Sequence, residues 1–261
     1  MDLNLQGKVA LVVASSQGLG KAVATQLVKE GASVMLTSRD EKNLQAACEE
    51  LTSLGLGKVS YCPADITKVE DVQRLVQVTR DTLGKIDILI NNAGGPPGGN
   101  FEQFSDEDWQ KAFELNLLSY IRMIREVLPD LKKEGGRIIN IASSSIKVPI
   151  PGLILSNTFR TGIVGLSKSL AEELAPYNIL VNTVAPGRIA TARVAFLDEL
   201  KAKKLGVSRE DIEEQSKKTI PLGRYGAPEE FANVVAFLVS DAGSYMTGSS
   251  LLVDGGMVKS I

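Results

Sequence analysis

VALVVASSQGLGKAVATQLVKE, residues 9–30, is the stretch of sequence that decides the fold. It begins with a continuous apolar run from Val9 to Ala14, continues through a glycine-rich turn, and ends with a helical pattern that reaches Glu30. A short strand that is apolar at every position is typical of a parallel sheet whose two faces are both covered by helices. The stretch therefore predicts a strand, a tight turn and a helix of an α/β protein.

The same alternation of apolar runs and amphipathic stretches continues to the end of the chain. Further strands are expected at 32–36, 59–62, 86–90, 137–142, 179–184 and 251–253. Between them, helices are expected after a capping box formed by Thr67 and Glu70, at about 106–131 and 157–175, and from Pro228 to near Ser240. The pattern predicts a Rossmann-type doubly wound parallel sheet of about seven strands with helices on both faces.

The glycine-rich turn between the first strand and its helix is a candidate phosphate-binding site. Glycines let the backbone approach a diphosphate closely, and the N-terminus of the helix offers N–H groups and a positive dipole end. The alternative is an ordinary strand-to-helix turn, since a single match of this kind is a weak signal. Residues 188–226 are the one long break in the alternation. We therefore expect one dinucleotide-binding domain over 1–261, with 188–226 as a lid that lies over the sheet and the substrate.

The end of the second strand indicates which dinucleotide is bound. Ser38 is small and neutral, and Arg39, which follows it, carries a permanent charge suited to the 2′-phosphate of NADP. Two alternatives remain for this segment. Arg39 is a solvated side chain in the first, and in the second Asp40 pairs with Arg39 instead of capping the next helix. NADP is the expected cofactor, with NAD as the other possibility.

The composition excludes several classes of function. The chain contains no histidine, which excludes a Ser-His-Asp triad and histidine-ligated zinc. Cys48 and Cys62 have no metal-like spacing, so we expect no metal site and a reducing, cytoplasmic location. With 29 basic and 31 acidic residues, the chain has no overall charge that would attract nucleic acid or a membrane. A small-molecule substrate is expected instead.

Several short motifs follow the predicted strands: Pro63-Ala64-Asp65-Ile66, Asn91-Asn92-Ala93-Gly94, Ser143 after Ile139-Asn140-Ile141-Ala142, and Pro186-Gly187. With the glycine-rich turn and Leu115-Asn116-Leu117, they resemble the short-chain dehydrogenase/reductase family, and within it the branch of 3-oxoacyl-(acyl-carrier-protein) reductases. The resemblance covers essentially the whole chain, including Val253-Asp254-Gly255-Gly256 near its end. It implies cofactor contacts at the first turn, at the ends of the next strands and after the sixth strand. The residues concerned are Ala14, Ser16, Gln17, Gly18, Leu19, Gly20, Ser38, Arg39, Asp65, Ile66, Asn92, Ala93, Gly94, Arg160, Pro186, Gly187, Ile189 and Thr191.

The resemblance also implies four catalytic positions, and two of them depart from the family pattern. Asn116 and Ser143 match the family's asparagine and serine. The tyrosine expected thirteen residues after Ser143 is Ser156, and the lysine expected four residues later is Arg160. The first turn departs as well, because Ala14 stands where the family has glycine. Alanine at this position is strained if the backbone there is left-handed.

Loss of the tyrosine removes the expected proton donor, a function that contributes about 10²–10⁴-fold to catalysis. Ser156 has a shorter and far less acidic hydroxyl, and Arg160 stays protonated. Three hypotheses remain. The first is an NADP(H)-dependent oxidoreductase acting on a carbonyl or secondary alcohol, with another proton donor or water. The second is a catalytically impaired sensor or partner subunit that binds the dinucleotide. The third is a lyase or isomerase.

Three side chains are candidates for the missing proton donor. Tyr120 lies one helical turn after Asn116, and Lys147 and Tyr225 lie in loops near the expected cleft, although core or surface positions are the simpler interpretation of each. The run 94–99, rich in glycine and proline, is expected to line the cleft. The helices at 106–131 and 157–175 resemble the family's subunit-interface helices, which implies a homotetramer or homodimer.

Overall fold

The computed structural model describes residues 2–260, and its sheet has seven parallel strands in the order β3-β2-β1-β4-β5-β6-β7. The strands are β1 (Val9–Val13), β2 (Ser33–Thr37), β3 (Val59–Tyr61), β4 (Ile88–Asn91), β5 (Gly136–Ile141), β6 (Ile179–Pro186) and β7 (Ser250–Val253). The order reverses at β1, which pairs with β2 on one side and β4 on the other. The predicted doubly wound parallel sheet is confirmed. In such sheets, ligands bind at the carboxyl ends of the strands where the order reverses.

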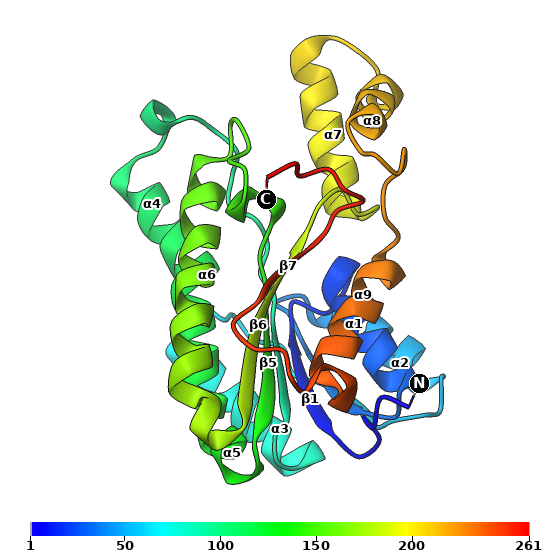
Figure 1. The fold of residues 1–261 in the computed structure, drawn as a ribbon, viewed down its shortest axis with the longest axis vertical. Coiled ribbons are helices and arrows are strands. Elements are labelled where there is room, and N and C mark those ends of the chain that lie inside the picture. Colours follow the sequence, from blue (N-terminus) through cyan, green and yellow to red (C-terminus); the bar gives the residue numbers. More distant parts are fainter. Residues whose placement is uncertain (1, 261) are drawn as a thin grey trace.

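Helices cover both faces of the sheet (Figure 1). The helices α1 (Gly18–Lys29), α2 (Glu41–Thr52) and α9 (Pro228–Val239) pack on one face. On the other face lie α3 (Val69–Leu83), α5 (Ser119–Glu134) and α6 (Ile154–Leu174). A shorter helix, α4 (Asp106–Phe113), joins α5 through one π-helical turn at Glu114–Leu118. Each face of the sheet therefore has its own hydrophobic core.

The uniformly apolar sequence of β1 follows from this arrangement. Ala10 and Val12 belong to the core under α1 and α9, while Leu11 and Val13 belong to the core under α3 and α5. Successive side chains of a strand point to opposite faces, so a strand in the middle of a covered sheet must be apolar at every position.

Two local predictions were wrong. Thr67 does not cap α3, which begins at Val69 after Lys68; the Thr67 hydroxyl instead donates to Asp65 Oδ1 at 2.7 Å. The Asp65 carboxylate is therefore the partner of the Thr67 hydroxyl, and this contact holds Thr67 in a turn before α3. The single helix expected at 106–131 is divided by the π-helical turn into α4 and α5.

Residues 188–226 form two helices, α7 (Ala192–Leu205) and α8 (Arg209–Lys218), which project beyond the end of the sheet (Figure 1). A parallel bridge between Ile189 and Gly226 closes the base of this segment. At that base, Arg188 Nη1 lies 2.5 Å from Asp198, which also accepts a hydrogen bond from Tyr225. Over residues 2–260, no helix is both long and apolar enough to cross a membrane.

Candidate functional site

The turn between β1 and α1 brings two backbone segments into close contact. Gly18 has a φ of +58°, and a Cβ placed on Gly20 would lie 2.2 Å from the carbonyl oxygen of Ala14. Only glycine fits at position 20, because any side chain would overlap that oxygen. The turn is also tied to the sheet, since the buried Ser15 hydroxyl donates to Val12 O and accepts from Thr37 N. The amide groups at the start of α1 are thus held at the end of the sheet, where they can bind an anion.

Ala14 has a φ of +51°, so the backbone at this position is left-handed and the alanine there is strained. A left-handed residue other than glycine costs roughly 1–2 kcal/mol, whereas glycine loses more entropy on folding. We predict that Ala14→Gly raises the free energy of unfolding by about 0.5–1 kcal/mol, measured by urea denaturation. The matched control is Ala22→Gly within α1, which should lower stability by about 1 kcal/mol. A loss of stability with Ala14→Gly would contradict this account.

A cavity at the end of β2 is lined by the residues expected to hold the adenosine half of a dinucleotide. Among them are Ser16, Gln17, Ser38, Arg39, Asp65 and Ile66. Asp40 caps α2, because its carboxylate accepts from the backbone N–H of Asn43 at 3.0 Å and from its side chain at 2.8 Å. No ion pair joins Arg39 to Asp40 or to another carboxylate within the described residues. Of the two alternatives for Asp40, helix capping is the one observed.

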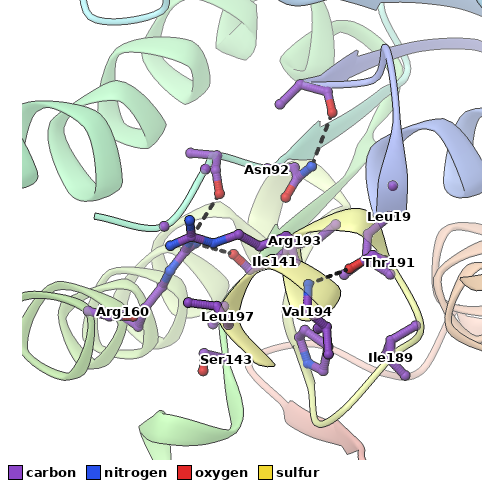
Figure 2. Close-up of a pocket in the computed structure, with 18 of the residues that line it drawn as sticks. Leu19, Asn92, Ile141, Ser143, Arg160, Ile189, Thr191, Arg193, Val194 and Leu197 are labelled. Carbon is purple, nitrogen blue, oxygen red and sulfur yellow. Dashed lines mark hydrogen bonds between the residues drawn. The ribbon is translucent and has the colours of Figure 1, made fainter. Parts of the chain in front are cut away.

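A second cavity, of about 330 Å³, adjoins the first and brings Ser143, Ser156 and Arg160 together. Its lining also includes these predicted cofactor residues: Ala14, Gln17, Gly18, Leu19, Asn92, Ala93, Gly94, Pro186, Gly187, Ile189 and Thr191. Gly95 and Pro96 line it as well, which agrees with the expectation for the 94–99 loop. Figure 2 shows Ser143 and Arg160 in this cavity, together with side chains from α7.

The two serines present free hydroxyl groups to the cavity. Ser143 Oγ accepts from the backbone N–H of Ser145 at 3.2 Å, so its own hydrogen remains available to a ligand. The side chain of Ser156, on the first turn of α6, makes no hydrogen bond to the described residues, although it lines the cavity. Both hydroxyls can donate to a substrate oxygen.

Arg160 is anchored by the protein backbone rather than by a carboxylate. The side chain is 5% exposed; Nη1 donates to Ile141 O at 2.8 Å and to the Tyr120 hydroxyl at 2.9 Å, and Nη2 donates to Ala93 O at 2.9 Å. A guanidinium has five N–H donors, so two remain for a ligand. Since no carboxylate in the described chain pairs with it, Arg160 brings an uncompensated positive charge to the cavity.

The three candidate proton donors lie outside this cavity. Tyr120 is 1% exposed, and its hydroxyl donates to Ile141 O at 2.8 Å. Burial raises the pKa of Tyr120, an effect that the nearby charge of Arg160 partly opposes. Tyr225 donates to Asp198, and burial raises its pKa as well. Lys147 is exposed. Tyr120 and Tyr225 therefore hold other side chains in place rather than facing a substrate.

Asn116 is the one predicted catalytic residue that does not line the cavity. It lies in the π-helical turn, fully buried, with its Nδ2 donating to Ala112 O at 3.2 Å. Its Oδ1 is buried with no partner in the described chain, and Asn116 does not line the cavity. Conversely, the cavity includes Arg193, which the sequence analysis missed. The available signal was its position two residues after Thr191, in the first turn of a helix that follows a predicted cofactor segment.

Comparisons with known proteins identify relatives that match nearly the whole chain. A family model described as enoyl-(acyl carrier protein) reductase matches residues 13–258. Dehydrogenase/reductase SDR family member 4 of Caenorhabditis elegans is 41% identical, over 97% of this chain and 95% of the relative. The 3-oxoacyl-[acyl-carrier-protein] reductase of Aquifex aeolicus is 37% identical, over 98% and 100% respectively. The structure of L-sorbose reductase from Gluconobacter frateurii with NADPH and L-sorbose is 33% identical, with a TM-score of 0.95 and full coverage of both chains.

Proposed function

The chain belongs to the short-chain dehydrogenase/reductase family of oxidoreductases, and from this we propose that it is an NADPH-dependent reductase of ketones, similar to 3-oxoacyl reductases, with a modified active site. One observation carries the proposal. The cavity at Arg39 and the cavity at Arg160 share four lining residues, so they form one elongated site across the end of the sheet; these are Ala14, Gln17, Ala93 and Gly94. A dinucleotide needs such a site, with one end for each nucleotide.

The residues present fit an NADP molecule. The start of α1 and its close contact at Gly20 suit the diphosphate, and the unpaired Arg39 suits the 2′-phosphate. The solved structures similar to this chain include YwfH, described as an NADPH-dependent reductase involved in bacilysin biosynthesis, at 33% identity and a TM-score of 0.92. These points favour NADP over NAD.

When bound, NADPH supplies a hydride to the carbonyl carbon, and the protein must stabilise the negative oxygen that results. The Ser143 and Ser156 hydroxyls are free to donate to this oxygen, and Arg160 places a positive charge in the same cavity. Stabilisation by prepositioned donors and charges is often the largest catalytic term. Water then supplies the proton, because no tyrosine, lysine or carboxyl group of residues 2–260 lines this cavity.

The proposal is tested by following NADPH absorbance with purified protein and a panel of ketones, including acyl thioesters that carry a 3-oxo group. We expect oxidation of NADPH that depends on the ketone. Because Ser156 replaces the family's proton-donating tyrosine, a second candidate function is a nucleotide-binding sensor or partner subunit without turnover. Tight NADPH binding with no oxidation on the whole panel would replace the first function with the second.

The preference for NADP leads to a prediction at Arg39. Arg39→Ala should raise the dissociation constant of NADPH about ten-fold and leave that of NADH nearly unchanged, because a charged hydrogen bond to a phosphate contributes about 1.5 kcal/mol or more. Isothermal titration calorimetry with both cofactors measures the effect. Arg209→Ala is the matched control, because Arg209 is an exposed residue of α8. An equal loss for NADH and NADPH would show that Arg39 does not recognise the 2′-phosphate.

We further propose that residues 1–261 act as a single dinucleotide-binding domain, with 188–226 as a lid over the substrate. Val194 and Leu197 of α7 line the cavity, which supports this role for the segment. The chain is also proposed to be a homotetramer or homodimer through α4, α5 and α6. In support of that surface, Phe101 is 67% exposed and stacks edge-on against Trp109 of α4.

A further inference from the structure

A second arginine, Arg193, reaches the cavity that contains Arg160. It lies in the first turn of α7, whereas Arg160 comes from α6, and Figure 2 draws both side chains in the cavity. Arg193 Nη2 lies 3.4 Å from Pro96 O, and a Cβ placed on Gly95 would lie 3.2 Å from the same nitrogen. The guanidinium thus rests against the loop that follows β4, where a larger residue than glycine would displace it.

The charges of these two arginines are not balanced by the protein. Neither forms an ion pair within residues 2–260, and the cavity lining contains no aspartate or glutamate. Two carboxylates behind the lining are already engaged. Asp198 binds Arg188 and Tyr225, and Asp254 accepts from the backbone N–H groups of its own loop. An anion entering the cavity therefore meets two cationic side chains and no carboxylate of the lining.

The carbonyl group that Arg193 contacts lies further along the loop after β4 than the residue that contacts the nucleotide turn. Asn92 Nδ2 donates to Ala14 O of that turn, Ala93 O accepts from Arg160, and Pro96 O accepts from Arg193. In order along the loop, these three contacts are made with the nucleotide turn, with Arg160 and with Arg193. The amide groups at the start of α1 would donate to a bound diphosphate. Arg193, which lines the same cavity as Leu197, is then available to a substrate.

We propose that the substrate is an oxyanion as well as a ketone: it carries a carboxylate or phosphate that Arg193 binds, while its carbonyl oxygen faces Ser143 and Arg160. A guanidinium suits both groups, because its planar fork can donate two parallel hydrogen bonds to them. This inference rests on the proposed reductase function, and it specifies the class of substrate. Arg193 selects the substrate and orients it, and Arg160 stabilises the reacting oxygen.

The test uses matched pairs of ligands that differ only in charge. For the carboxylate, pyruvate and levulinate are compared with their methyl esters; for the phosphate, dihydroxyacetone phosphate is compared with dihydroxyacetone. Binding is measured by calorimetry in saturating NADP⁺, which cannot donate a hydride, and in nucleotide-free protein. We expect an anion to bind about ten-fold or more tightly than its neutral counterpart, the usual effect of a charged hydrogen bond. The ligand pair that shows this preference tells whether the charged group of the substrate is a carboxylate or a phosphate.

Variants at position 193 separate this role from cofactor binding. Arg193→Gln should remove the preference for the anion and leave the affinity for the neutral ligand and NADP⁺ unchanged, whereas Arg193→Lys should keep part of it. Arg209→Gln is the matched control in the same segment, and circular dichroism checks that each variant folds. Equal binding of anionic and neutral ligands, no binding of any anion, or a loss confined to NADP⁺ would overturn the proposal. A failure of the reductase function would appear separately, as absent NADPH oxidation or binding.

Discussion

Ser156→Tyr combined with Arg160→Lys is expected to raise the turnover number for ketone reduction by about 10²–10⁴-fold, the usual contribution of a general acid. Position 156 lines the cavity on the first turn of α6, so a tyrosine there would direct its phenol toward the bound ketone. A lysine at 160 would keep a positive charge one helical turn away, where it favours ionisation of the phenol.

The measurement is the initial rate of NADPH oxidation on the ketones that the parent protein reduces slowly. The single variants are the controls: Ser156→Tyr alone should recover part of the gain, and Arg160→Lys alone should recover none. A parent protein without turnover whose double variant is active would identify the natural chain as the sensor or partner subunit. No gain in any variant would mean that the cavity does not place a ketone next to position 156.

Arg160→Leu is expected to lower the turnover number by about 10²–10³-fold, the typical effect of removing one stabilising donor from a reacting oxygen. The change also removes the hydrogen bonds to Ala93 O, Ile141 O and Tyr120, so the free energy of unfolding should fall by about 1–3 kcal/mol. Leucine is chosen because it fills much of the same space without a donor.

Steady-state kinetics and urea denaturation measure the two effects separately. Arg122→Leu on α5 is the matched control, because Arg122 also donates to a backbone carbonyl, that of Thr67, but lies outside the cavity. The control should lower stability without a comparable loss of turnover. If Arg160→Leu raised the Michaelis constant and left the turnover number unchanged, Arg160 would bind substrate rather than stabilise the transition state.

Much of the fold followed from the sequence by itself, because burial on both faces of a strand requires apolar residues in an unbroken run, as in β1. The glycine-rich turn was equally informative, although the sequence explained its glycines only by the approach of a diphosphate. The structure adds that Gly20 is required by close contact with Ala14 O. The resemblance to the short-chain dehydrogenase/reductases implied that Ser143, Ser156 and Arg160 share one site, and all three line the same cavity. For β1 and the glycine-rich turn, the signal lies within a single strand or turn, where neighbouring residues are placed by a regular geometry.

The tertiary structure alone decided which partners these side chains have. Arg160 meets Tyr120 and Ala93, which are 40 and 67 residues away along the chain, and Arg193 meets Pro96 at a distance of 97 residues. The sequence also left Asp40 with two possible partners, and it misplaced Thr67 in a capping box. The physical reason is that a side chain bonds to whichever group the packed helices and strands bring nearest, and local periodicity carries no record of those distant groups.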